Sequence, residues 1–73
     1  MQVNVDLLVK KIEDCNMSMD NFARAIGMNP STFYRQKSKG FLSMSIGQMH
    51  STVDVLDLPI DEAKNIFLFE NSR

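Results

Sequence analysis

The chain has 73 residues, 44% of them hydrophobic and 23% charged, and its formal net charge at pH 7 is -1. This length and composition predict a single globular domain over residues 1–73 and exclude a disordered or fibrous chain. The longest apolar run, 66–69, is far shorter than the ~20 residues that span a bilayer, so we expect a cytoplasmic protein without membrane contact.

The first predicted helix begins after Asn4, a favourable N-cap, and runs to about Cys15. Asp6 lies in its first turn, where the positive end of the helix dipole stabilises a carboxylate. Its apolar residues recur on one face: Val5, Leu8 and Ile12. We therefore expect an amphipathic helix packed on a core, and we interpret Cys15 as a small apolar residue near its end.

Two short helices follow, separated by one tight turn. The second begins after Ser18 and ends at Gly27, which supplies a left-handed residue. Its apolar residues have the i, i+3, i+4, i+7 spacing: Met19, Phe22, Ala23 and Ile26. The third is capped by Asn29, has Pro30 at its first position, where a missing N–H costs nothing, and runs to about Lys37.

The fourth helix is predicted from a capping box formed by Ser45 and Gln48, after a loop over 38–42. Gly47 in its first turn weakens it by up to about 1 kcal/mol relative to alanine. Four of its residues are spaced for burial: Ile46, Met49, Val53 and Leu56. His50 adjoins this row, so we interpret it as a packing or interface residue.

The fifth helix is predicted over about 60–69, after Pro59. Three of its residues are expected to pack inward: Ile60, Ala63 and Phe67. Ile66 and Phe69 then lie on another face, which predicts an apolar patch that a second subunit covers. The alternative is that this end of the chain frays or folds back over the core. No segment is predicted to be a strand.

The charges are unevenly distributed along the chain. All nine carboxylates lie at or before Asp20 or at or after Asp54. The stretch between them contains four basic residues: Arg24, Arg35, Lys37 and Lys39. A chain with a small negative charge can thus present one basic face, because a phosphate feels the field within a Debye length of ~8 Å.

The second and third helices have the features of a helix-turn-helix. Ala23 is small where the two helices approach, Met28 lies beneath the turn, and Phe33 faces the core. The residues left outside on the third helix are hydrogen-bonding: Ser31, Thr32, Tyr34, Arg35 and Ser38. Such side chains on a helix without carboxylates are suited to reading base edges in the major groove.

The run Asn-Pro-Ser-Thr-Phe-Tyr-Arg at 29–35, with Met17-Ser18 and Met44-Ser45-Ile46, resembles the lambda-repressor-like (Cro/repressor, XRE) family, especially phage-encoded regulators. The resemblance covers about 5–69. It implies an all-α, five-helix bundle that binds a pseudo-palindromic operator on double-stranded DNA as a homodimer. It assigns base contacts to Pro30, Ser31, Tyr34 and Arg35, and phosphate contacts to Ser18, Thr32, Lys37, Ser38 and Lys39. Arg35 is the expected reader of guanine, worth ~1–3 kcal/mol of discrimination.

Besides Gly47, the chain departs from the family pattern in two other places. Met19 stands where many relatives have a glutamine that clamps a phosphate, and Asp20 beside it would repel one. Near the end of the third helix, Gln36 and Lys37 replace an apolar residue, so Phe41 or Leu42 is expected to cover that part of the core.

An alternative function is a protein-interaction module, such as an antirepressor, that keeps this fold but binds another phage regulator. The acidic ends of the chain and its net charge favour it. An enzyme is not expected, because the carboxylates are scattered and no nucleophile has a base at a plausible spacing. One cysteine and one histidine allow no intramolecular disulfide and no structural zinc site, so we expect neither a metal nor a cofactor.

Overall fold

The computed structural model describes residues 3–67, which form five helices. These are α1 (Val5–Asp14), α2 (Met19–Ala25), α3 (Pro30–Ser38), α4 (Ile46–Leu56) and α5 (Ile60–Phe67). The described part of the chain contains no strand, so the prediction of an all-α, five-helix chain is confirmed for it. No helix within it is long and apolar enough to cross a membrane.

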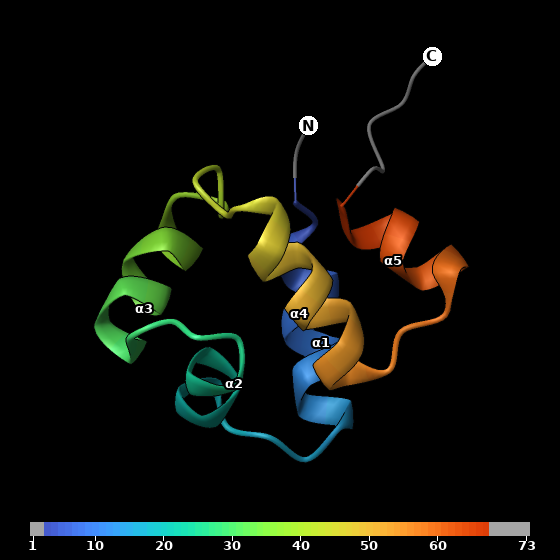
Figure 1. The fold of residues 1–73 in the computed structure, drawn as a ribbon, viewed down its shortest axis with the longest axis horizontal. Helices are drawn as coiled ribbons and strands as arrows, with labels where there is room; N and C mark the ends of the chain where they lie inside the picture. The colour runs from blue at the N-terminus through green and yellow to red at the C-terminus, as the bar shows by residue number, and fades with distance from the viewer. Residues whose placement is uncertain (1–2, 68–73) are drawn as a thin grey trace.

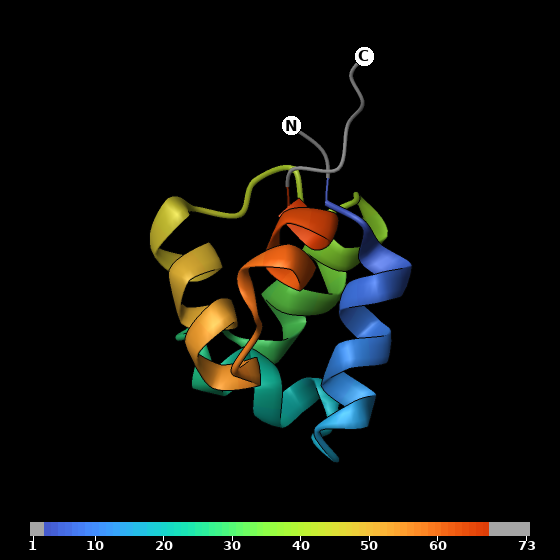
Figure 2. The same cartoon turned by 90° about the vertical axis from the view of Figure 1, so that its right-hand side faces the viewer.

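The helices are arranged with α1 behind α4, α2 and α3 on one side, and α5 on the other (Figure 1). Figure 2 shows α5 in front, between α1 and α4. The backbone N–H of Asn4 donates to the carbonyl of Ile66 at 2.7 Å, so the two ends of the described chain lie side by side. The Lys11 ammonium also contacts the Glu62 carboxylate at 2.7 Å, which joins α1 to α5 a second time.

Side-chain caps determine where the first four helices begin, as predicted. Three of the caps accept a backbone N–H from the first turn that follows: Asn4, Ser18 and Asn29. Ser45 and Gln48 form the capping box, in which each side chain accepts the other residue's backbone N–H, at 3.1 and 3.0 Å. Each cap satisfies a helix N–H that would otherwise lack a partner and stabilises its helix by ~1 kcal/mol.

The connection between α2 and α3 is tight because Gly27 adopts a left-handed conformation, with φ of 78°. Met28 then folds back so that its N–H donates to the carbonyl of Ala23 at 2.8 Å, and its side chain is buried. Both the turn and the burial of Met28 and Ala23 agree with prediction. The axis of α3 is thus set relative to α2 by four residues, 26–29.

Three phenylalanine rings form the centre of the core on the α3 side. Phe33 is completely buried and meets Phe22 edge-on at a ring separation of 5.8 Å. Phe41 lies 5.2 Å from Phe33, after α3 has ended. Phe41 is 1% exposed whereas Leu42 is 72% exposed, so Phe41 covers the end of α3. Phe41 has a φ of 58°, a strained conformation for a bulky residue that this burial offsets.

The predicted buried face of α4 is partly wrong. Ile46 is 73% exposed, and Thr52 is completely buried instead. The Thr52 hydroxyl donates to the carbonyl of Gln48 at 2.8 Å, so its polar group is satisfied within its own helix and costs little to bury. Leu56 is buried as predicted.

The predicted face of α5 is also partly wrong, although Phe67 is buried as predicted. Ile60 is 74% exposed, whereas Ile66 is completely buried. The start of α1 lies against this end of α5, where the N–H of its cap Asn4 donates to the Ile66 carbonyl. Ile66 therefore belongs to the core and not to an exposed dimer patch. Phe69, the other residue assigned to that patch, lies outside the described residues.

Candidate nucleic-acid interface

The outer side of α3 is the candidate interface, and the core residue Phe33 holds it in place. Ser31, Tyr34, Arg35 and Ser38 are exposed, and Pro30, Thr32 and Lys37 are half-buried. The base-contact residues of the sequence prediction thus share one helix and lie at or near its surface. Ser18, predicted to contact phosphate, caps the neighbouring helix α2.

Two hydrogen bonds organise the polar groups along α3. The Arg35 guanidinium donates to the Thr32 hydroxyl at 3.5 Å, and the Ser38 hydroxyl donates to the Arg35 carbonyl at 2.7 Å. The Thr32 bond uses one of the guanidinium's N–H groups and leaves the planar fork on the surface. The side chain is thus partly oriented while it can still form the paired bonds that guanine accepts.

A carboxylate also reaches this interface, and sequence reasoning missed its contact with α3. The Tyr34 hydroxyl donates to Asp20 Oδ1 at 2.9 Å, and so connects α3 to the first turn of α2. This hydrogen bond, together with partial desolvation and the negative charge of Asp20, raises the pKa of Tyr34 above its ordinary value. The third helix itself carries no carboxylate, as predicted, but Asp20 of α2 lies against its outer side. The sequence signal that could have revealed this contact is the tight α2–α3 turn, because such a turn brings the start of α2 back beside the middle of α3.

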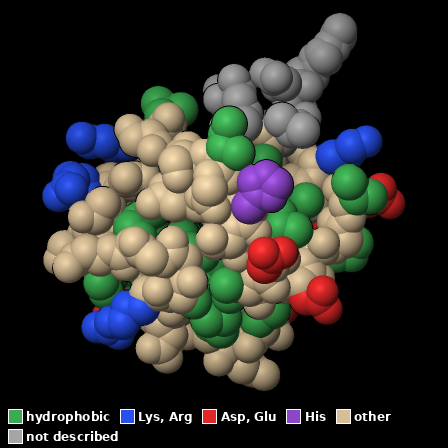
Figure 3. All heavy atoms as spheres, in the orientation of Figure 1, with side chains coloured by type: hydrophobic (Ala, Val, Ile, Leu, Met, Phe, Trp, Pro, Cys, Tyr) green, Lys and Arg blue, Asp and Glu red, His purple; other side chains and the backbone are tan. Residues whose placement is uncertain are grey.

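Four of the basic residues lie on the same side of the molecule as α3. Figure 3 shows Lys and Arg side chains mainly over α2 and α3, and Asp and Glu side chains mainly over α4 and α5. Arg24, Arg35 and Lys39 are exposed, and Lys37 is half-buried. The uneven charge distribution along the sequence thus becomes an uneven distribution in space, which can attract a polyanion to one side.

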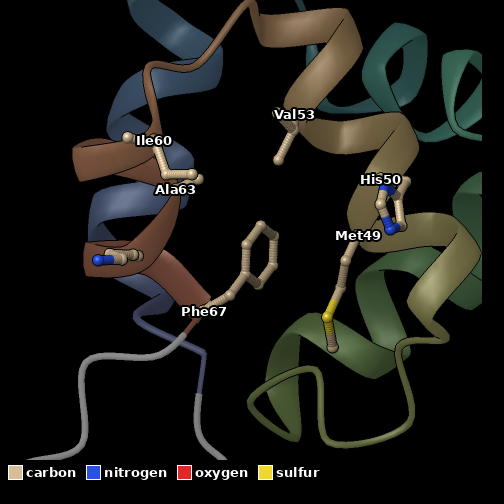
Figure 4. A pocket seen from close by; sticks show the side chains of 7 residues that line it. Met49, His50, Val53, Ile60, Ala63 and Phe67 are labelled. Atoms are coloured by element: carbon tan, nitrogen blue, oxygen red, sulfur yellow. The ribbon is translucent and has the colours of Figure 1, made fainter.

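An apolar groove of about 260 Å³ lies between α4 and α5. Its lining side chains are Met49, His50, Val53, Ile60, Ala63, Lys64 and Phe67. The Phe67 ring points into the space between the two helices (Figure 4). His50 is exposed and lines the groove, consistent with a contact residue. Because its lining includes the exposed Ile60, the groove presents apolar side chains to the surroundings.

The remaining chemistry-bearing residues form no cluster among the described residues. Cys15, interpreted from the sequence as a small apolar residue, is exposed, and its thiol donates to the Leu56 carbonyl at 4.0 Å. Residues 3–67 contain no group of three His, Cys, Asp or Glu side chains that could hold a metal ion. No protein-family model matches the chain, and searches of curated proteins and of solved structures gave no significant match.

Proposed function

We propose that this protein is a sequence-specific DNA-binding regulator of the helix-turn-helix type, with the lambda-repressor-like arrangement of five helices. In this proposal α3 is the helix that enters the major groove and α2 lies across the backbone. The observation that carries it is the exposed row of hydrogen-bonding side chains on α3, held rigid from beneath by the buried Phe33 ring. A polar, uncrowded helix face on a firm support is what base reading requires.

The proposed roles follow from the chemistry of each side chain. Arg35 donates to guanine O6 and N7, and Pro30 and Ser31 at the start of α3 contact neighbouring base edges. Phosphates are bound by Lys37 and Lys39 and by three hydroxyl groups, those of Ser18, Thr32 and Ser38. Regulation then occurs by occupancy of the operator or by direct contact with polymerase, as for a cytoplasmic repressor or Cro-like protein of a phage or prophage.

The proposal includes a homodimer on a pseudo-palindromic operator. Two α3 helices must then enter successive major grooves, about 34 Å apart. The domain measures 34 × 23 × 20 Å along its principal axes, so two copies side by side can meet this spacing. The groove between α4 and α5, with Ile60 at 74% exposure, is the apolar surface that such a contact would cover.

The test is a binding selection from random duplex DNA at low and physiological salt, with the wild type and Arg35→Ala in parallel. We expect a palindromic motif with the wild type, and loss of a guanine preference with the variant. Arg24→Ala is the matched control, because Arg24 is an exposed cation of α2 outside α3. It should weaken binding to all sequences alike and leave the motif unchanged. A folded wild type that enriches no motif would contradict the proposal.

A second candidate function is a protein-interaction module, such as an antirepressor, that binds another regulator. The apolar groove between α4 and α5 favours it, as does the presence of Asp20 beside α3. Salt separates the two functions. DNA binding should weaken by orders of magnitude as salt rises through the physiological range. Binding releases counterions from the DNA, and this release is less favourable when the solution already contains more salt. Binding through an apolar groove should change little.

A further inference from the structure

The Asp20–Tyr34 pair occupies a defined place on the outer side of α3. Tyr34 is 47% exposed, and its ring meets Phe33 edge-on at 5.8 Å, which limits the directions its hydroxyl can take. Asp20 is half-buried, and its Oδ1 lies 2.9 Å from that hydroxyl. Both groups are thus fixed relative to α3, and both remain within reach of a molecule placed against it.

The pair can only accept further hydrogen bonds. An ionised carboxylate has no donor, and a tyrosine hydroxyl has a single proton, which here is directed to Asp20. The same bond raises the pKa of Tyr34, so the hydroxyl keeps this proton throughout the physiological pH range. The remaining lone pairs of Tyr34 Oη and Asp20 Oδ2 are therefore acceptors only.

A surface that has only acceptors can form hydrogen bonds with some of the groups of DNA and not with others. Phosphate oxygens are acceptors, and so are guanine O6 and N7 and thymine O4. Adenine N6 and cytosine N4 are the amino groups that the major groove presents as donors. Acceptors placed against another acceptor stay unpaired when water is removed. Binding to a base that presents only acceptors at this place therefore costs free energy.

We infer that Asp20 and Tyr34 together form a specificity element that selects a base with an amino group in the major groove, adenine or cytosine. The inference rests on the proposed function and deepens it. Arg35, the next residue along α3, has only donors and selects guanine. In this inference each half-site contains both a guanine and an amino-bearing base, read by two side chains of α3 with opposite hydrogen-bonding character.

The test is the same selection from random duplex DNA with wild type, Tyr34→Phe and Asp20→Asn. We expect one wild-type position occupied by adenine or cytosine, and about a tenfold loss of that preference in Tyr34→Phe with the rest of the motif unchanged. Asp20→Asn introduces an N–H donor and removes a negative charge. It should admit guanine or thymine at this one position and strengthen binding to all sequences.

Lys39→Ala is the control, because Lys39 is an exposed cation beyond the end of α3 and should affect all sequences equally. Tyr34→Phe keeps the ring that packs on Phe33, and thermal unfolding monitored by circular dichroism checks that both variants are folded. A wild-type motif with no position altered in either variant overturns the inference and leaves the proposed function standing. Enrichment of no motif by the wild type contradicts both.

Discussion

The two sides of the domain differ in how much apolar surface they expose. On the α2–α3 side the large aliphatic and phenylalanine side chains are buried, except Leu42 in the following loop. On the α4–α5 side Ile46 and Ile60 are 73% and 74% exposed. On the first side the exposed groups are polar, and a closely packed cluster of aromatic rings lies beneath them. On the second side apolar side chains are exposed, and an open apolar groove lies between the two helices. This difference is the basis of our proposal that one half contacts DNA and the other a second subunit.

The largest expected effect comes from removing the ring at the centre of the first side. Phe33→Ala should lower the free energy of unfolding by about 3–5 kcal/mol, because it leaves a cavity between Phe22 and Phe41. Ile60→Ala is the matched control, and it should change stability by no more than about 0.5 kcal/mol because Ile60 is exposed. Urea unfolding monitored by circular dichroism measures both. Equal losses in the two variants would remove the contrast between the halves.

The next effect concerns association and sharpens the interpretation of the second side. Ile60→Asp should weaken self-association by about ten- to a hundredfold, because a charge would enter an apolar contact. Its stability as a monomer should stay close to that of the wild type. Sedimentation velocity over a concentration series gives the dissociation constants, and Leu42→Asp, at a similarly exposed position in the loop after α3, is the control. A wild type that remains monomeric at high micromolar concentration would exclude a dimer through this surface.

A smaller effect tests whether local caps hold the second side together. Ser45→Ala removes the hydroxyl that accepts the Gln48 N–H and should cost about 1 kcal/mol of stability. Ser43→Ala lies two residues earlier in the exposed loop and should cost close to nothing. Thermal unfolding compares the two. If Ser45→Ala proved neutral, the start of α4 would depend on tertiary packing and not on its capping box.

The smallest effect is a dependence of stability on pH in the alkaline range. The hydrogen bond and ion pair with Glu62 raise the pKa of Lys11 above its ordinary value of 10.5. This contribution is fully present below 10.5 and is lost as the pH rises through the higher value of the folded state. Chemical unfolding at pH 9 and above pH 11 should thus show a larger loss for the wild type than for Glu62→Gln. Identical losses would show that the α1–α5 ion pair contributes nothing measurable.

The helix boundaries could be predicted because their signals are local. Asn29 followed by Pro30, and Ser45 followed by Gln48, act within one helical turn, and the structure has helices at both places. The rotation of α4 and α5 about their axes could not be predicted in the same way. Thr52 is buried because its hydroxyl is satisfied by Gln48, a bond that no pattern of apolar residues reveals.

The same division between local and distant contacts applies to the candidate site. The outward residues of α3 follow from its helical period and from Phe33, so their exposure could be predicted. The partner of Tyr34 could not, since Asp20 is distant in sequence and reaches it only through the α2–α3 turn. The sequence therefore indicated the basic side, and placed Asp20 beside an expected phosphate contact, but it did not reveal the bond between Asp20 and Tyr34.

The hydrogen bond between Asn4 and Ile66 closes almost the whole described chain into a loop. Contacts between residues so far apart in sequence have a high entropic cost of loop closure, so α1 and α5 are expected to meet late in folding, after the local α2–α3 pair. The same junction is then among the first to open in the native protein, which amide hydrogen exchange at Asn4 would detect as weak protection. Transient opening there would release α5 from α1 while the helix proposed to read DNA keeps its structure.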